Sequence, residues 1–460
     1  MKYTLAIDIG ASSGRHIIGY MENGKMVLEE IYRFPNYMDG VDGHRVWDTK
    51  RLFNEILAGL IKAKEIGKIP ETIGIDTWGV DYALLDKDDN LLEPVYAYRD
   101  SKNAGLADKV SKIIPFEDVY ANCGIEFADF NTIYQLYGDK ISGKMDKAET
   151  FLTLPDYFNF LLTGVKRQEY TDATTTSLIN IKTHTWDYSI IEKLGYKKSL
   201  FKELSQPGTV VGNVSEDIAN ILGYKPTVIL PATHDTASAV LAVPDGGNKE
   251  AYISSGTWSL MGVENPFAIT EETFNGKAFS NEGSINYNFR VQTNIMGMWI
   301  FQNVKKEFGT YSFTELTAMA ENSTYQGIFN VNDKAFFAPQ SMIEAINNDF
   351  INRGVAPPEG IGDVCRSVFL SLADCYAKTI EGVSNVVGKK FNALHIIGGG
   401  SQNELLNKLT AKSTKLPVIA GPTEATAIGN VLIQLIYLNE IESLIEGKNI
   451  IKQSFDIYVV

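Results

Sequence analysis

A carboxylate, an imidazole and two hydroxyls lie together in the stretch Thr233-His234-Asp235-Thr236. The stretch follows an apolar run, 226–230, that predicts a strand, and it precedes small residues suited to a closely packed helix. In α/β proteins, ligands bind where a strand ends and a helix begins. We expect the positive end of the helix dipole to keep Asp235 ionised, so that its carboxylate can accept a proton. Helix capping is the alternative role for Asp235.

Small residues form a turn after the first predicted strand. Strand 3–9 ends in Asp8-Ile9-Gly10, and further strands are predicted at 16–21 and 26–32. The turn therefore joins two strands, whereas a Rossmann phosphate loop leads directly into a helix, and the chain has no P-loop motif either. A turn of small residues can still gather backbone N–H groups around a phosphate, and Arg15 adds a positive charge. A plain hairpin turn is the alternative.

A second strand, 72–77, leads into Trp78-Gly79. Trp78 is either a core residue or the wall of a pocket. Gly79 marks either a bend or a close approach of a ligand to the backbone. Further along, the pair Arg99-Asp100 is expected to be a salt bridge rather than part of a site.

The second half of the chain repeats the opening pattern. A Pro/Gly-rich linker covers 243–249, and residues 251–262 then predict strand, glycine turn and strand. Ser254-Ser255-Gly256 occupies the place of Asp8-Ile9-Gly10, so only the first copy has the carboxylate. The repeat predicts a duplicated α/β domain, divided as 1–243 and 244–460, with a ligand between the two copies.

A glycine turn near the C-terminus is suited to nucleotide binding. Strand 392–397 runs into Gly398-Gly399-Gly400, and a helix is predicted at 404–410. A helix N-terminus after a glycine-rich turn presents backbone N–H groups to a phosphate. We predict a closing strand at 416–420 and one last apolar helix after it.

Composition excludes several classes of protein. The chain has 460 residues and a formal net charge of −14, which argues against a nucleic-acid partner. Its three cysteines lack metal-ligand spacing, which favours a reducing compartment. No apolar run approaches the length of a membrane span, so we expect a cytoplasmic protein without a membrane partner.

Six motifs, taken together, resemble the FGGY carbohydrate kinases, and the similarity runs in order along nearly the whole chain. They are Asp8-Ile9-Gly10-Ala11-Ser12-Ser13-Gly14-Arg15, Gly74-Ile75-Asp76-Thr77-Trp78-Gly79-Val80-Asp81-Tyr82, Thr233-His234-Asp235-Thr236-Ala237-Ser238, Ser255-Gly256-Thr257-Trp258-Ser259-Leu260, Asn294-Ile295-Met296-Gly297 and Gly421-Pro422-Thr423-Glu424-Ala425-Thr426. The resemblance implies two actin-like (ribonuclease-H-like) ATPase domains that flank a central cleft, with the sugar and phosphate side in the first domain and the nucleotide side in the second.

The resemblance also implies a reaction and its residues. The reaction is transfer of the γ-phosphoryl group of ATP, with Mg²⁺, to O1 of L-rhamnulose in L-rhamnose catabolism. Asp235 is the implied proton acceptor, and the implied sugar contacts are Gly79, His234, Asp235, Thr236 and Asn294. The implied nucleotide contacts are Ala11, Ser12, Ser13, Gly14, Arg15, Thr257, Gln302 and Gly400, and Asp8 matches the carboxylate that positions Mg²⁺, usually through water.

Three alternatives to this function stay open at the level of sequence. The acceptor could be another ketose, such as L-fuculose or a pentulose. The same fold also serves actin-like ATPases that act on no small molecule. A regulatory sugar-binding module is expected to lack Asp8 or Asp235, and both are present. The oligomeric state cannot be read from the sequence.

Overall fold

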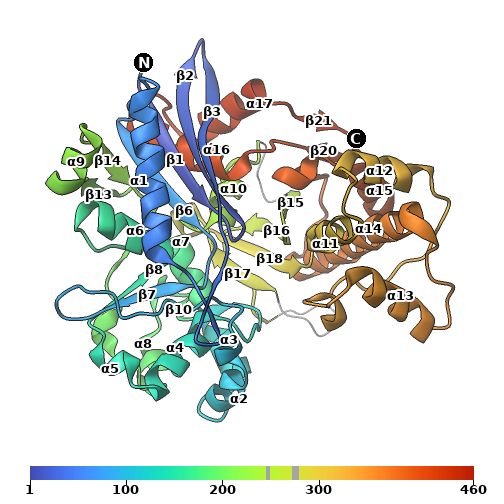
Figure 1. Cartoon of the computed structure of the whole chain (residues 1–460), viewed down its shortest axis with the longest axis horizontal. Helices are drawn as coiled ribbons and strands as arrows, with labels where there is room; N and C mark the ends of the chain where they lie inside the picture. Colours follow the sequence, from blue (N-terminus) through green and yellow to red (C-terminus); the bar gives the residue numbers. More distant parts are fainter. Residues whose placement is uncertain (245–248, 272–278) are drawn as a thin grey trace.

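The computed structural model describes residues 1–244, 249–271 and 279–460 (Figure 1). Two mixed sheets form the centre of the molecule, and helices cover both of them. Residues 245–248 of the predicted linker lie outside the described part of the chain. Within the described part, no helix is both long enough and apolar enough to cross a membrane.

The first sheet has six strands in the order β13-β14-β6-β1-β2-β3. Their bounds are β1 Thr4–Ile9, β2 Ser13–Glu22, β3 Lys25–Pro35, β6 Thr72–Thr77, β13 Val210–Asn213 and β14 Thr227–Ile229. Strands β1, β2 and β3 are antiparallel, and β6 and β14 lie parallel to β1 on its other side. The predicted opening meander is confirmed. Helix α1 (Thr49–Glu65) covers this sheet, and the Asp48 side chain caps it by accepting from the Arg51 N–H at 2.8 Å.

The second sheet has the order β17-β18-β16-β15-β19-β20-β21. Its strands are β15 Glu250–Ser255, β16 Ser259–Asn265, β17 Ser280–Gly283, β18 Phe289–Ile295, β19 Ala393–Ile397, β20 Val418–Ala420 and β21 Tyr458–Val459. Strands β15, β16 and β18 are antiparallel, while β19 and β20 run parallel to β15. The two halves therefore share one topology, and the predicted duplication is confirmed.

Two predictions at the C-terminus are wrong. Strand β20 does not close its sheet, because β21 pairs with it in antiparallel orientation. The apolar helix α16 (Ala425–Tyr437) is not the last helix either, since α17 (Leu444–Ser454) follows it. A two-residue strand is too short to give a periodic pattern, and α17 has only two buried residues, so neither element stands out in the sequence.

The two halves meet through helices that occupy equivalent places. Helix α10 (Asp235–Leu241) follows the last parallel strand of the first half, and α16 follows that of the second half. The helices pack closely, because a Cβ on Gly429 of α16 would lie 1.8 Å from the backbone oxygen of Ser238 in α10. From α16, Asn430 also donates to the first sheet, to the Gly74 carbonyl at 3.1 Å.

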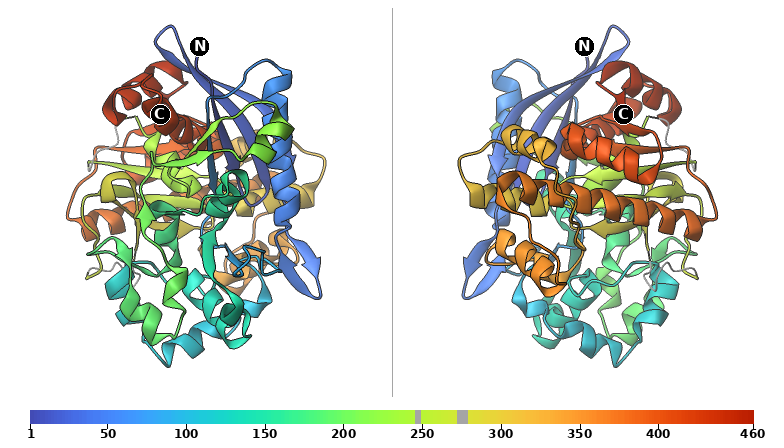
Figure 2. Two further views of the ribbon diagram at one scale, coloured as in Figure 1. Left: turned by 90° about the vertical axis from the view of Figure 1, so that its left-hand side faces the viewer. Right: turned by 90° about the vertical axis from the view of Figure 1, so that its right-hand side faces the viewer.

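The first half carries a helical insertion between β7 (Tyr82–Leu85) and β14. Its main helices are α2 Leu106–Ser111, α3 Phe116–Cys123, α4 Thr132–Ile141 and α8 Tyr188–Lys193, whereas α6 Leu154–Thr163, in the same interval, packs against the first sheet. Helices α2, α4 and α8 gather at the bottom of Figure 1, and this part is also at the bottom of both views in Figure 2. The second half is covered by α11 Trp299–Phe308, α12 Phe313–Asn322, α13 Met342–Asn352, the long α14 Gly360–Val387 and α15 Glu404–Thr414.

Candidate active site

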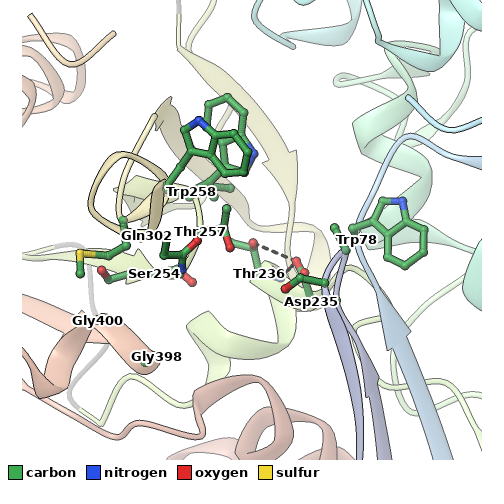
Figure 3. A pocket seen from close by; sticks show the side chains of 18 of the residues that line it. Trp78, Asp235, Thr236, Ser254, Thr257, Trp258, Gln302, Gly398 and Gly400 are labelled. Atoms are coloured by element: carbon green, nitrogen blue, oxygen red, sulfur yellow. Dashed lines mark hydrogen bonds between the residues drawn. The ribbon is translucent and has the colours of Figure 1, made fainter. Parts of the chain in front are cut away.

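A cleft of about 1360 Å³ lies between the two halves and is lined by residues of both. Of the fourteen site residues that the resemblance implies, thirteen line this cleft: Asp8, Ala11, Ser12, Ser13, Arg15, Gly79, His234, Asp235, Thr236, Thr257, Asn294, Gln302 and Gly400. Figure 3 shows Asp235 and Thr236 between Trp78 on one side and Gln302 and Gly400 on the other. The structure therefore brings residues that are as far apart in the sequence as Asp8 and Gly400 to one cavity.

Gly14 is the predicted residue that does not line the cleft. Its Cα faces the ring of Phe34 on the neighbouring strand, and a Cβ there would lie 2.0 Å from the ring. Close packing of β2 against β3 accounts for this glycine. Its backbone still belongs to the hairpin turn, in which the Gly10 N–H donates to the Ser13 carbonyl at 2.9 Å.

Asp235 is the first residue of α10, and one of its two carboxylate oxygens is already engaged. Oδ1 accepts from the Thr236 N–H at 2.5 Å and from the Thr236 hydroxyl at 3.1 Å, and it lies 3.5 Å from Nε2 of His234. No hydrogen bond or ion pair from the described residues reaches Oδ2. The side chain is 29% exposed. Asp235 thus binds backbone at its helix N-terminus and also presents an oxygen to the cleft.

Burial has the largest influence on the acidity of Asp235. It raises the pKa of the carboxyl above the ordinary value, His234 partly offsets this rise, and the nearby Asp8 adds to it. That the carboxylate is ionised stays a prediction. A carboxylate with a raised pKa is a stronger base, which suits a group that must take a proton from an alcohol.

Two buried charged residues beside His234 were missed from the sequence. Glu282 on β17 and Arg290 on β18 are directly opposite each other in the sheet and form an ion pair at 3.0 Å. Nδ1 of His234 lies 3.1 Å from Nη2 of Arg290 and 3.2 Å from Oε2 of Glu282. The sequence around them shows only a short polar strand, so their pairing with a histidine 48 and 56 residues away leaves no local signal.

A second carboxylate lies beside Asp8 and was also missed as a site residue. Asp8 on β1 is paired in register with Asp76 on the parallel strand β6. Asp76 is fully buried; its Oδ2 accepts from the Asn430 amide at 2.5 Å, and its Oδ1 has no hydrogen-bond partner in the described chain. Burial, and then the charge of Asp8, raise the pKa of Asp76 well above its ordinary value. The useful sequence signal was an aspartate near the end of each of two adjacent parallel strands.

These carboxylates fit a hydrated divalent cation. Asp8, Asp76 and Asp235 influence one another electrostatically, and the orphaned oxygen of Asp76 is a buried acceptor without a donor. Among the described residues, no three His, Cys, Asp or Glu side chains are close enough to enclose a metal ion directly. Mg²⁺ usually keeps several water ligands and binds through only one or two carboxylates, so the arrangement is suitable for it.

Arg15 joins the two halves across the cleft. Its guanidinium forms an ion pair with Asp8 at 2.6 Å and a second one with Glu424, the residue before α16. The positive charge predicted to face a phosphate is therefore already matched by two carboxylates. A phosphate could bind Arg15 only by competing with these two carboxylates, unless a cation bound Asp8 and so released it from Arg15.

The second half presents small residues where the first half presents carboxylates. The Gly256 N–H donates to the Trp258 carbonyl at 2.8 Å and closes the β15–β16 turn that carries Thr257. Gly400 packs against this turn, because a Cβ there would lie 1.9 Å from the Ser255 hydroxyl. This surface offers backbone groups and little charge.

The part of the cleft around Trp78 and Asn294 is built from residues of both halves. The Asn294 side chain donates to the Glu126 carboxylate at 2.8 Å, which fixes its orientation. Trp78 is 7% exposed and packs in the core against Trp47 with its ring centroid 4.2 Å away, yet both rings also line the cleft. Both readings of Trp78 are thus correct.

The backbone at Gly79-Val80 is held in an unusual conformation. A Cβ on Gly79 would lie 2.9 Å from Thr175, so close packing requires glycine there. Val80 has φ +70°, which is rare for a β-branched residue. Its N–H donates to the Thr175 hydroxyl at 3.1 Å, and its carbonyl accepts from Thr132 at 2.7 Å. Such strain is concentrated at functional sites.

The expected salt bridge between Arg99 and Asp100 is absent. Asp100 instead accepts from His44 at 2.9 Å and from the Arg45 N–H at 2.6 Å. The Arg99 guanidinium lies in the cleft, where its carbon is 5.1–5.9 Å from the ring centroids of Trp258, Trp299 and Phe337 of the second half. Adjacent opposite charges suggested a pair, but aromatic rings distant in sequence hold the arginine instead.

Comparison with known proteins agrees with this architecture. The family model for the N-terminal domain of the FGGY family of carbohydrate kinases matches residues 3–242, and the one for the C-terminal domain matches 251–438. Proteins named rhamnulokinase from Oceanobacillus iheyensis and Halalkalibacterium halodurans are 44% and 45% identical to the chain. The first alignment covers 99% of this chain and 97% of the relative, and the second covers 99% and 98%.

Solved structures share the fold at low sequence identity. Gluconate kinase from Lactobacillus acidophilus superposes with a TM-score of 0.82 at 16% identity, covering 100% of this chain and 93% of that one. Plasmodium falciparum glycerol kinase with ADP gives a TM-score of 0.78 at 16% identity, covering 99% and 94%. With two actin-like α/β halves, a carboxylate-bearing cleft and family matches over both halves, the chain belongs to the FGGY family of carbohydrate kinases.

Proposed function

We propose that the protein transfers the γ-phosphoryl group of ATP to O1 of L-rhamnulose, a step of L-rhamnose catabolism. The observation that carries this proposal is that Asp235 lines the cleft with Oδ1 engaged by Thr236 and His234, while no hydrogen bond or ion pair from the described residues reaches Oδ2. The choice of sugar rests on relatives named rhamnulokinase that align over almost the entire chain. A cytoplasmic location stays a prediction from sequence.

Asp235 is the proposed proton acceptor. The O1–H bond of the sugar breaks as the O1–phosphorus bond forms, and the proton moves to Oδ2 of Asp235. The bond between the γ-phosphorus and the bridging oxygen breaks with its electron pair, which leaves on ADP. Because the transition state of phosphoryl transfer is loose, positioning and charge neutralisation provide most of the rate. The raised pKa of Asp235 keeps the carboxylate basic enough for this late proton transfer.

The remaining cleft residues orient the sugar. His234, Thr236 and Asn294 offer polar groups, and Gly79 lines the cleft beside them. The Trp78 ring supplies an apolar wall. A few convergent polar groups beside an apolar wall are typical of small-molecule binding sites.

The nucleotide is assigned to the side of the second half. Thr257, Gln302 and Gly400 would contact it there, and the first hairpin, 11–15, would face its phosphates. Mg²⁺, held near Asp8, would neutralise phosphate charge when it is bound. Asp8, which lines the cleft, would hold the ion, and the buried Asp76 lies beside Asp8 on the neighbouring strand. We also propose that the domains divide as 1–243 and 244–460.

The test is a coupled assay of ADP release over a panel of ketoses: L-rhamnulose, L-fuculose, L-ribulose and D-xylulose. We expect strong dependence of ADP release on added sugar, with the highest kcat/KM for L-rhamnulose, and a product phosphorylated at O1 by NMR. A higher kcat/KM for another ketose would overturn the choice of sugar. ADP release that is independent of every ketose would instead indicate an actin-like ATPase.

A further inference from the structure

The side chain of His234 is enclosed by charges from the other half of the molecule. Arg290 is fully buried and Glu282 is 6% exposed, and both contact Nδ1 of the imidazole. Arg290 also donates to the Gly283 carbonyl at 3.2 Å, which fixes its guanidinium on the strand pair. Burial alone would raise the pKa of Glu282, but Arg290 and His234 lower it to about 2, so the carboxylate is charged at every physiological pH.

These contacts determine which nitrogen of His234 carries a proton. If Nδ1 accepts from Arg290, the neutral ring has its proton on Nε2. Nδ1 does accept, because a guanidinium can only donate and Oε2 of Glu282 has no hydrogen-bond partner among the described residues. The protonated Nε2 is then the nitrogen next to Asp235, 3.5 Å from its Oδ1.

Oδ1 of Asp235 thus has two hydrogen bonds and one longer charge contact. Oδ1 of Asp235 is approached by the Thr236 N–H, the Thr236 hydroxyl and Nε2 of His234. The carboxylate is thereby fixed in rotation, and Oδ2 faces the cleft. A base whose reactive oxygen is held in place needs less reorganisation when the substrate arrives.

We propose that Glu282 and Arg290 are positioning residues for phosphoryl transfer: through His234 they hold Asp235 with Oδ2 toward the sugar hydroxyl. The inference rests on the proposed role of Asp235 as the base. Since His234 and Asp235 belong to the first half and the ion pair belongs to β17 and β18, the base is fully oriented only when the two halves are in register across the cleft.

The first test is the pH dependence of kcat/KM in a Glu282→Gln, Arg290→Met double variant, which removes the ion pair without leaving a buried charge unpaired. We expect kcat to fall by about 10–100-fold, as for the loss of residues that orient a reactive group, with the KM for ATP little changed. The groups that interact with Asp235 are His234, Asp8, Asp76 and Asp172. Loss of the oriented N–H removes a contact that favours the ionised carboxylate, so the acid limb moves to higher pH.

The matched control is Asp139→Asn, which breaks a different buried ion pair. Asp139 is 3% exposed and binds Lys102 at 3.1 Å and the Tyr82 hydroxyl at 2.5 Å, away from the cleft lining. We expect this variant to lose stability while the acid limb stays in place. The proposal is wrong if the double variant behaves like Asp139→Asn, with lower stability but an unmoved acid limb and a normal kcat.

A spectroscopic measurement separates this inference from the function itself. The chain has five histidines, so ¹⁵N-labelled imidazole signals can be assigned to His234 by comparison with His234→Gln. We expect a protonated Nε2 in the wild type and a mixture of tautomers in the double variant. An unchanged His234 signal in the double variant would overturn the positioning role, even if Asp235→Asn is inactive. Near-normal turnover of Asp235→Asn would overturn the proposed function but leave the tautomer result standing.

Discussion

The two halves of the molecule have one topology but opposite chemistry at the ends of their central strands. In the first half, Asp8 on β1 is in register with Asp76 on β6. In the second half, the equivalent positions are Ser254 on β15 and Ile397 on β19, which are paired in the same way. The central strands of the first sheet thus end in carboxylates and those of the second end in uncharged residues, although charged residues of the second half, such as Glu282 and Glu424, also line the cleft.

This difference shows that the shared fold places residues at equivalent positions, while the residue types at the strand ends determine the chemistry. In the first half, Asp8 raises the pKa of both Asp76 and Asp235, and these carboxylates are suited to a cation and a base. Glycines in the second half allow a close approach to backbone. Gly400 lies against Ser255, and Gly256 closes the turn. The predictions below test whether the two functions are really divided in this way.

The largest effect is expected for Asp235→Asn. The amide keeps the shape of the side chain but cannot accept the sugar proton, so kcat should fall by about 10²–10⁴-fold. Steady-state ADP release with saturating L-rhamnulose measures this loss. Turnover within a few-fold of the wild type would show that Asp235 is only a helix cap.

A smaller effect is expected for Asp8→Ser, which gives the first half the residue found at the equivalent position of the second half, Ser254. The loss of a carboxylate near the cation should raise the Mg²⁺ concentration for half-maximal activity by about 10–100-fold. Mg²⁺-dependent protection from thermal unfolding in the presence of ADP gives a second reading. The control is Glu424→Gln, which removes the other partner of Arg15 and leaves Asp8 in place. Equal Mg²⁺ requirements in the two variants would assign the effect to Arg15 instead.

The smallest effect is expected for Gly400→Ala in the second half. The new methyl group would lie 1.9 Å from the Ser255 hydroxyl, so the glycine turn has to shift. We expect ADP to bind about tenfold more weakly, or roughly 1.4 kcal/mol, with kcat at saturating ATP nearly unchanged. Titration calorimetry measures the affinity. A Ser255→Gly, Gly400→Ala double variant removes the clashing side chain and should recover part of the loss; if it does not, packing against Ser255 is not the cause.

The architecture could be predicted largely from the sequence because it is encoded locally. Short apolar runs, the small-residue turns that follow them and the repeated glycine hairpins each leave a signal within about a dozen residues. The main candidate residues for the site were found because they cluster at strand ends, as Asp8 and Asp235 do. The short strand β21 and helix α17 were not found, since few of their residues are buried.

The interactions that tune the site could not be predicted, because they join distant segments. In the sequence, Asp76 is only one residue of a predicted strand, and its place beside Asp8 follows from the pairing of two strands. Glu282 and Arg290 meet His234 only after the second sheet is folded against the first half. Arg99 was expected to pair with its neighbour, and it lies instead among rings of the second half. Charge and ring partners of this kind depend on tertiary packing, which periodicity does not encode.

The division between the two halves is tested most directly by the ADP affinity of Asp235→Asn, measured by titration calorimetry in the presence of Mg²⁺. If the first half provides the base and the second half holds the nucleotide, the dissociation constant should stay within about twofold of the wild type while turnover is lost. A dissociation constant raised about tenfold or more, as expected for Gly400→Ala, would contradict the account, because the carboxylate and the nucleotide would then share one site.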